Sequence, residues 1–228
     1  PVTTTQLTTI TDQFTDSSYT LTYTKLKDSA SNLNSTRTSY IDSVQNLTVT
    51  VDEDSYTAGS SEEIYNVKST LHSTSSLVYT KIYDSYAQID SYSASDSTLW
   101  DGITVEVSDT SLTADQFVNL TTTLGATASS IDISDTVAGL TEDNENLSGA
   151  DSVTLAITAT GDHSAVAFDS DVSAITIAEN AVATISATLL DQVGSITGDG
   201  SYRVYDAYAD VTDTFALGEL AGVTVEVS

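Results

Sequence analysis

Short segments that alternate between apolar and polar residues recur along the chain. Alternation at every second residue is typical of a strand with one buried face. Eight segments have this pattern, namely residues 23–28, 47–51, 79–84, 103–107, 131–135, 153–157, 202–206 and 223–227. Four of them end in an aspartate, at Asp28, Asp84, Asp135 and Asp206. The pattern therefore predicts eight short strands, half of which share the same last residue.

Helices are expected in two classes between these strands. One class covers about residues 2–14, 60–71, 112–124 and 177–193, and the last segment has apolar residues at helical spacing. Ser60 with Glu63, and Thr113 with Gln116, have the spacing of a capping box. The other class begins after the four recurrent aspartates, which we expect to be N-caps. In residues 29–44 and 89–99 the Ser-, Thr- and Asp-rich sequence allows a loop equally well.

These elements form a repeat of strand, helix, strand and helix. The recurrent aspartates lie 56, 51 and 71 residues apart (28 to 84, 84 to 135, 135 to 206). We divide the chain into a helix that completes a preceding repeat (1–22), repeat 1 (23–78), repeat 2 (79–130), repeat 3 with an insertion near 160–174 (131–201) and a partial repeat 4 (202–228). Such units bury their apolar faces against their neighbours. The prediction is an α/β solenoid-like array of about four units with a mainly parallel sheet; a β-sandwich repeat array is the alternative.

The charge of the chain excludes several classes of partner. There are 33 acidic and 6 basic residues, and the net charge is −27. Nucleic acids and anionic membranes need a basic patch, so neither is an expected partner. No apolar run approaches the roughly 18 residues that span a bilayer. With 71 Ser and Thr residues and no Cys or Met, the composition is typical of an exported protein at the cell surface.

Calcium is the cofactor that this acidic sequence suggests. The recurrent aspartates could bind calcium in register, but capping a helix needs only one carboxylate and is the favoured interpretation. Asp162, Asp169 and Asp171 gather in the insertion of repeat 3 and are the best calcium candidates. The alternative is that they are solvated loop charges. We also expect divalent cations to stabilise the fold by binding to the folded state.

The sequence gives little support to catalysis. His72 and His163 are the only histidines, and their spacing does not suit a shared metal. No Gly-x-Ser-x-Gly elbow or phosphate-binding loop is present. The chain is therefore not predicted to be an enzyme.

Aromatic residues and sequons suggest contacts with sugars. Trp100 and the 12 tyrosines could stack on carbohydrate. For Trp100, and for the tyrosines at equivalent repeat positions, the core is the favoured location. Those tyrosines are Tyr23, Tyr79 and Tyr202. Candidate glycosylation sites are Asn34, Asn46, Asn119 and Asn146, a number close to chance in so Ser- and Thr-rich a chain.

One composite motif resembles a known class of repeats. It reads Tyr/Ile-x-Ile/Val-x-Asp-Thr/Ser-x-Ala-x-Leu, then Val-Thr-Val-x-Val, then Ser-Leu-Thr-Ala, and is clearest in residues 131–140, 102–120 and 202–227. This motif resembles the degenerate tandem repeats of very large bacterial cell-surface proteins, among them adhesins, sheath proteins and surface-layer-like proteins of cyanobacteria and other marine bacteria. The resemblance implies a mechanical function in coating, attachment or filament building.

We therefore expect a structural extracellular protein that assembles head to tail into a filament, sheath or surface coat. Residues 2–10 align with residues 112–120, which follow a second strand, so the start of one copy matches what should follow the end of another. The expected interface consists of Val2, Leu7 and Ile10 at one end and Val223, Val225 and Val227 at the other. The alternative is a carbohydrate-binding adhesin or phage-fibre module with cell-surface glycans as partners.

Overall fold

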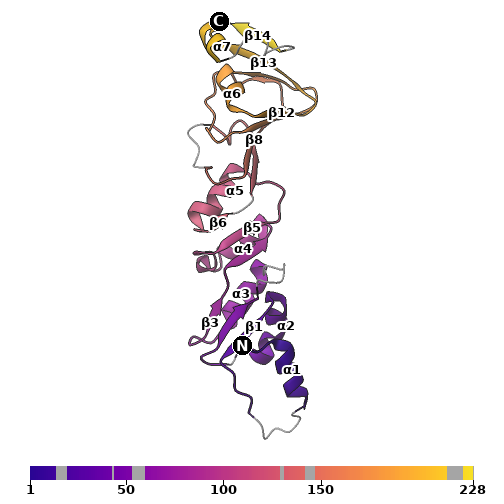
Figure 1. Ribbon diagram of the computed structural model, residues 1–228, viewed down its shortest axis with the longest axis vertical. Helices are drawn as coiled ribbons and strands as arrows, with labels where there is room; N and C mark the ends of the chain where they lie inside the picture. Colours follow the sequence, from indigo (N-terminus) through magenta and orange to yellow (C-terminus); the bar gives the residue numbers. More distant parts are fainter. Residues whose placement is uncertain are drawn as a thin grey trace. The chain divides into compact units, whose positions relative to one another are not determined.

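The computed structural model describes residues 1–13, 20–42, 44–52, 60–128, 131–141, 147–214 and 223–227. The chain divides into two compact units. Unit 1 consists of residues 1–109 and 121–128, and unit 2 consists of residues 110–120 and 129–228. Figure 1 follows the chain through both.

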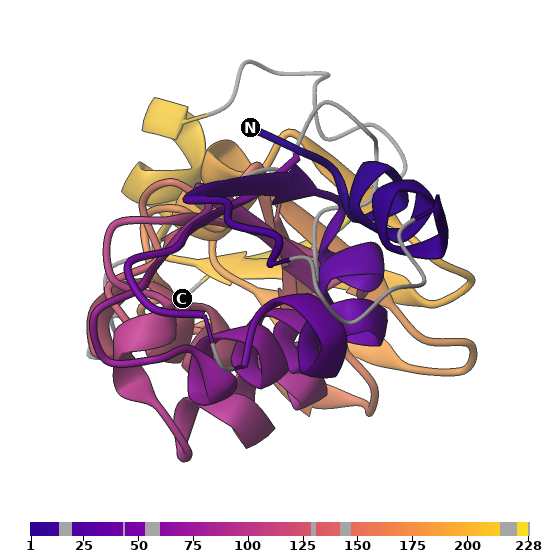
Figure 2. The same ribbon diagram turned by 90° about the horizontal axis from the view of Figure 1, so that it is seen from below.

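Unit 1 contains two three-stranded sheets and four helices. The first sheet has the order β1 (Lys25–Asp28), β2 (Thr48–Val51), β3 (Ser76–Val78), and Val2 adds a one-residue bridge to Leu26. The second has the order β4 (Lys81–Asp84), β5 (Thr104–Val107), β6 (Thr127–Ala128). The helices are α1 (Thr4–Gln13), α2 (Ala30–Tyr40), α3 (Ser61–Thr70) and α4 (Tyr86–Ser93), with a short 3-10 helix η1 (Ser97–Leu99). α1 packs against α2, α2 against α3, and α3 against α4. Figure 2 shows the indigo helix α1 beside the purple helices that follow it.

Unit 2 contains two four-stranded sheets. One has the order β12 (Ser195–Thr197), β10 (Ala174–Ile177), β8 (Ser152–Ile157), β7 (Asp132–Asp135). The other has the order β14 (Thr224–Val227), β13 (Ser201–Asp206), β11 (Val182–Ile185), β9 (Gly161–Asp162). The helices are α5 (Ala114–Val118), followed by a π-helical turn η2 (Asn119–Thr123), α6 (Ala187–Gln192) and α7 (Tyr208–Thr214).

Parallel pairing in a constant register builds the core of each unit. Every paired strand in the described residues is parallel to its neighbour, and the one antiparallel contact is an isolated bridge. Leu26 pairs with Val49, 23 residues later, and Leu155 pairs with Ile175, 20 residues later. These four side chains are all 0% exposed. Successive strands thus stack apolar side chains in rows, as the alternation of the sequence requires.

The predicted strands are confirmed. All eight alternating segments contain a strand, and β8 shows the expected burial of every second residue. The mixed α/β architecture with parallel sheets is also confirmed. The alternative of a β-sandwich is wrong, because sandwiches are built from antiparallel sheets and the described strands pair in parallel.

Two helix predictions are wrong, namely the helix over residues 177–193 and the helix after Asp135. Helices were expected near 2–14, 60–71 and 112–124, and α1, α3 and α5 form there. Residues 177–193 instead form the end of β10, the strand β11 and the short helix α6. Asn180, with a φ of 65°, lies in the tight turn between the two strands. Both strands are rich in β-branched residues and bury every second residue (Ile175 and Ile177, then Ala183 and Ile185), and this strand pattern overrides the apparent helical spacing.

The second class of helices forms after three of the four recurrent aspartates. α2, α4 and α7 follow Asp28, Asp84 and Asp206, whereas Asp135 is followed by a turn. The Ser- and Thr-rich segments where a loop was an open alternative contain α2, the end of α4 and η1. No helix in the described ranges is both long enough and apolar enough to cross a membrane.

Candidate functional site

The four recurrent aspartates connect successive strands through their carboxylates. In each, Oδ1 accepts a hydrogen bond from the backbone N–H of the next residue, at 2.7–2.9 Å. Oδ2 accepts one from the first residue of a helix that lies 19–24 residues earlier in the chain, at 2.8–3.0 Å. The pairs of donor and acceptor are Thr4–Asp28, Ser61–Asp84, Ala114–Asp135 and Ala187–Asp206. We call this arrangement the aspartate bracket.

The register of the strands places each bracket. Val2 pairs with Leu26, so Thr4, two residues after Val2, lies level with Asp28. The same holds in unit 2, where Leu112 pairs with Ile133 and the N–H of Ala114 meets Asp135. A fifth carboxylate, Asp109, accepts a hydrogen bond from the first residue of α4 at 2.7 Å. The bracket thus joins the helix after one strand to the end of the next strand.

The brackets correct the prediction that these aspartates cap the helices that follow them. The N-caps of α2 and α4 are Ser29 and Ser85, each one residue after the aspartate. The carboxylates of Asp28 and Asp84 satisfy the first N–H of the preceding helices α1 and α3 instead. The two predicted capping boxes, at Ser60 and Thr113, are confirmed.

The bracket of Asp28 favours the ionised form of its carboxylate. A helix N-terminus carries free N–H groups and a partial positive charge, which stabilise an anion. Burial alone would raise the pKa of Asp28. Hydrogen bonds from the Thr4 hydroxyl, from Asn32 and from the backbone of Thr4 and Ser29 outweigh burial, and the net effect lowers this pKa. The stability that Asp28 contributes is therefore present above its ordinary pKa of 3.8 and is lost as the pH falls below it.

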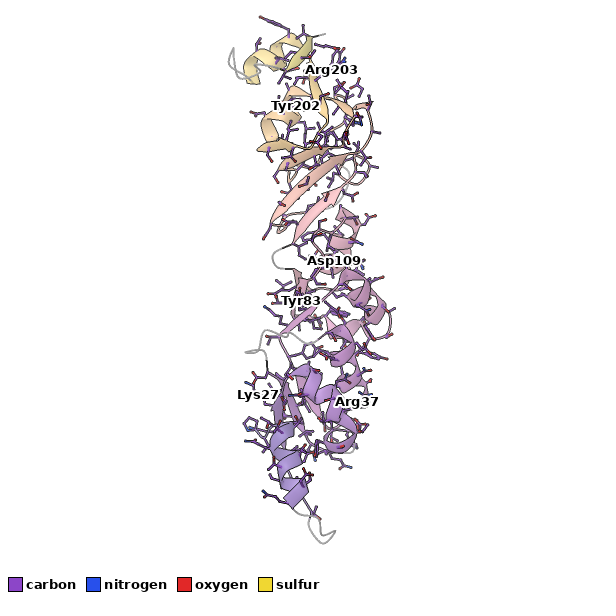
Figure 3. All side chains as sticks on the ribbon, turned by 90° about the vertical axis from the view of Figure 1, so that its right-hand side faces the viewer. Lys27, Arg37, Tyr83, Asp109, Tyr202 and Arg203 are labelled. Atoms are coloured by element: carbon purple, nitrogen blue, oxygen red, sulfur yellow. The ribbon has the colours of Figure 1, made fainter. Side chains whose placement is uncertain are left out.

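Ion pairs add a second set of connections between successive strands and helices. Four of the six basic residues pair with a carboxylate that lies 23–28 residues later in the chain. The pairs are Lys27–Asp52 (3.1 Å), Lys68–Asp96 (3.0 Å), Lys81–Glu106 and Arg203–Glu226 (3.3 Å). Figure 3 labels Lys27 and Arg203. Each pair is partly exposed and contributes roughly 0–1 kcal/mol, so the ion pairs are secondary to the buried apolar rows.

The calcium candidates are held by local hydrogen bonds. Asp162 accepts hydrogen bonds from the hydroxyl (2.7 Å) and N–H (3.0 Å) of Ser164, and these lower its pKa. Asp169 accepts one from the N–H of Asp171 at 2.7 Å. Within the part of the chain that the structure describes, no three acidic or histidine side chains come together as a metal-binding group. Calcium binding by Asp162, Asp169 and Asp171 stays a prediction.

The aromatic residues of the repeat are structural. Trp100 is 0% exposed, so its assignment to the core is confirmed and a sugar platform at Trp100 is wrong. The hydroxyls of Tyr23 and Tyr79 donate to the carbonyls of Tyr40 and Leu99, which follow 17 and 20 residues later. Burial, with a smaller contribution from Asp96, raises the pKa of Tyr79 to about 12. The third repeat tyrosine, Tyr202, is half-buried.

The residues expected at the assembly interface differ in exposure. Leu7 is 1% exposed and packs inside unit 1, so the prediction that it contacts another copy is wrong. Val2 is half-buried in its bridge to Leu26, and Ile10, Val223 and Val225 are also half-buried. Val227, at the end of an edge strand, is 53% exposed.

The sequons and histidines occupy unremarkable positions. The Asn34 side chain accepts a hydrogen bond from Arg37 within α2, and Asn119 begins the π-helical turn. Asn46 is exposed in a turn with a φ of 57°. Asn146 lies outside the described residues. For the histidines, Nδ1 of His72 lies 3.0 Å from the Thr74 hydroxyl, and the His163 backbone N–H donates to the Thr184 carbonyl.

Comparison with known protein families, curated proteins and solved structures finds no match for this chain.

Asp135→Ala should lower the free energy of unfolding by about 0.5–2 kcal/mol, the range for loss of an N-cap. The substitution leaves the N–H groups of Ala114 and Thr136 without their acceptor. Gly139 shows how closely this carboxylate is packed, because an added Cβ there would lie 2.4 Å from it. Asp135→Asn, which keeps one acceptor oxygen, should lose less. Urea titration followed by circular dichroism measures the change.

Asp151→Ala is the matched control, because Asp151 is exposed and lies in the same unit. It should change the free energy of unfolding by less than about 0.5 kcal/mol. An equal loss in Asp135→Ala and Asp151→Ala would show that the loss comes from removing a negative charge and not from the hydrogen bonds of the bracket. A loss in Asp135→Ala that disappears in EDTA would identify Asp135 as a metal ligand instead of a bracket.

Proposed function

We propose that the chain is a structural repeat protein, an α/β solenoid-like segment that forms part of an extracellular filament, sheath or surface coat. The observation that carries this proposal is the aspartate bracket, which recurs in both units with the same two hydrogen bonds. A repeated connection between neighbouring turns of chain is what a stacked array needs, because each repeat contacts mainly the next one.

The placement of the recurring polar contacts within the repeat supports a mechanical function. The brackets, the cross-strand ion pairs and the hydroxyls of Tyr23 and Tyr79 all connect one turn of chain to the next or close a single turn. These groups are engaged in holding the stack together and are not gathered around one cavity. Their repetition distributes load over many equivalent contacts.

The edges of the sheets supply a basis for head-to-tail contact. β14 is the edge strand of its sheet, and an edge strand presents backbone N–H and C=O groups that can pair with another strand. Val227 on β14 is half-exposed. Val225 of the same strand pairs with Val204 of β13, so only the other edge of β14 is open to a further strand. A heterologous contact of this kind propagates as a fibre when it does not close into a ring.

Assembly can be tested by analytical ultracentrifugation across protein concentration, with calcium and salt present to screen the charge of −27. We expect a concentration-dependent series of larger species. Val227→Asp and Ile10→Asp should each shift the series to monomer, because they place a charge at the proposed contact. Leu7 is unsuitable for this test because it is buried within its own unit.

Leu21→Asp is the matched control, because Leu21 is 41% exposed and lies outside the helices and strands, so the substitution adds the same charge away from any sheet edge. It should assemble as the unmodified chain does. A chain that stays monomeric at the highest concentration would contradict self-assembly. Assembly that persists in EDTA would remove calcium from the assembly proposal.

A further inference from the structure

Tyr83 and Tyr205 are the exposed aromatic residues of the described strands, at 47% and 38% exposure. Both follow a basic residue by two positions and precede a bracket aspartate by one, in the sequences Lys81-Ile82-Tyr83-Asp84 and Arg203-Val204-Tyr205-Asp206. The neighbouring strands β5 and β14 have the same sequence, Thr-Val-Glu-Val. One surface arrangement thus occurs once in each unit, and Figure 3 labels Tyr83 and Arg203 within it.

The register gives the two arrangements the same geometry. Tyr83 faces Glu106 directly across β4 and β5, and Lys81 pairs with this glutamate diagonally. In unit 2, Tyr205 faces Glu226, and Arg203 Nη1 lies 3.3 Å from Glu226 Oε1. Each site therefore presents a phenol ring beside a cation and a carboxylate. We call them the tyrosine sites, Lys81/Tyr83/Glu106 and Arg203/Tyr205/Glu226.

Packing of the protein itself does not account for these rings. Within the described residues, neither tyrosine hydroxyl has a hydrogen bond and neither ring has an aromatic partner. The residue before the bracket aspartate in the other two bracket strands is not aromatic, and is Lys27 in β1 and Ser134 in β7. The outer face of a bracket strand therefore does not require an aromatic residue at this position. Tyr83 and Tyr205 are the two exceptions, and they occupy the same position in their strands.

We propose that the two tyrosine sites each bind one pyranose ring of a neutral saccharide. A pyranose has an apolar C–H face that can pack on the negative face of an aromatic ring. Its hydroxyl groups need both donors and acceptors at the edge of that ring. The Lys81 ammonium or the Arg203 guanidinium donates, and the carboxylate of Glu106 or Glu226 accepts. Aromatic surface with a few convergent polar groups is the usual composition of a binding site for a small ligand.

Charge selects the class of ligand. A chain with a net charge of −27 repels polyanions, whereas a neutral polyol meets no such barrier. Each site offers one half-exposed ring and two polar side chains, so a single pyranose ring should bind weakly. Each unit carries one such site, so a polymeric saccharide, with many rings, meets each site at a higher local concentration of rings than a free monosaccharide offers.

Native gel electrophoresis in gels that contain soluble neutral polysaccharide tests the proposal. The probes are dextran, galactomannan and hydroxyethyl cellulose in separate gels. We expect at least one of them to retard the unmodified chain. Tyr83→Ala and Tyr205→Ala should each weaken retardation by at least twofold, and the double variant should migrate as in the gel without polysaccharide. Tyr83→Phe and Tyr205→Phe keep the ring and should remain retarded.

Tyr208→Ala is the matched control, because Tyr208 is 66% exposed on α7 and lies outside both sites. It should be retarded like the unmodified chain. Circular dichroism of each variant checks the fold. Absence of retardation with all three probes, equal retardation of the double variant, or an equal loss in Tyr208→Ala would each overturn the proposal.

The same variants separate this proposal from the proposed structural function. A double variant that assembles normally but no longer binds saccharide supports the tyrosine sites. A double variant that fails to assemble and is retarded normally overturns them and identifies the rings as contacts between copies.

Discussion

Trp100→Ala is expected to lower the free energy of unfolding by about 3–5 kcal/mol, the range for truncation of a large buried aromatic residue. Trp100 is 0% exposed, and it lies between η1 and β5 among the buried side chains Leu99, Ile103 and Val105. Its removal leaves a cavity that the surrounding strand and helix cannot fill without moving. Urea unfolding followed by far-ultraviolet circular dichroism measures the loss, since the variant has no tryptophan fluorescence.

Trp100→Phe is the control that separates packing from polarity. Phenylalanine keeps most of the apolar volume, and it removes an indole N–H that has no hydrogen-bond partner among the described residues. The loss should therefore be much smaller than for alanine. A change below about 1 kcal/mol in Trp100→Ala would contradict the burial of Trp100, since truncations of this size in a core cost several times more.

Local sequence signals predicted most of the secondary structure. The strands were predictable because a buried row in a parallel sheet requires alternation within four to six residues, and that pattern is visible in a single segment. The capping boxes at Ser60 and Thr113 were predictable for the same reason, since donor and acceptor lie three residues apart. Helix α2 formed in a segment that also suited a loop, because Ser29 caps it and Leu33 is buried.

The function of the recurrent aspartates could not be predicted from one segment. A carboxylate at the end of a strand can reach the helix that follows its own strand or the helix that follows the neighbouring strand. Both are helix N-termini, so the chemistry is the same and only the register decides between them. Asp135 and Ala114 meet because Ile133 pairs with Leu112, which lies 21 residues earlier. A spacing of 19–24 residues between a helix start and an aspartate is the signal that would have shown it.

The aromatic residue that composition singles out is not one of the exposed ones. Composition draws attention to Trp100 because it is the only tryptophan, but its position just before a strand places it inside. Tyr83 and Tyr205 lie in the alternating segments themselves, one position away from the buried Ile82 and Val204. The period of two residues therefore places both on the outer face, and this inference was available from the sequence.

Gly198→Ala should destabilise unit 2 by about 2–6 kcal/mol, as the sum of a disfavoured backbone conformation and an overpacked contact. Gly198 has a φ of 95° in the turn between β12 and β13. An added Cβ would lie 2.1 Å from the carbonyl oxygen of Ile177, at the end of the neighbouring strand β10. That carbonyl also accepts a hydrogen bond from the N–H of Gly200, so it cannot move away without breaking the contact between the two turns. Thermal and urea unfolding measure the loss.

Two other glycines of the same unit separate the two contributions. Gly149 has a φ of 102°, but nothing lies within 4 Å of an added Cβ, so Gly149→Ala reports the backbone conformation alone, about 1–3 kcal/mol. Gly194 has neither constraint, and its nearest neighbour would be the Ser173 carbonyl oxygen at 3.8 Å, so Gly194→Ala should be close to neutral. The excess of Gly198→Ala over Gly149→Ala then measures how tightly successive turns of chain stack. An excess near zero would mean that the turns can separate without loss, and it would contradict the close stacking on which the proposed solenoid depends.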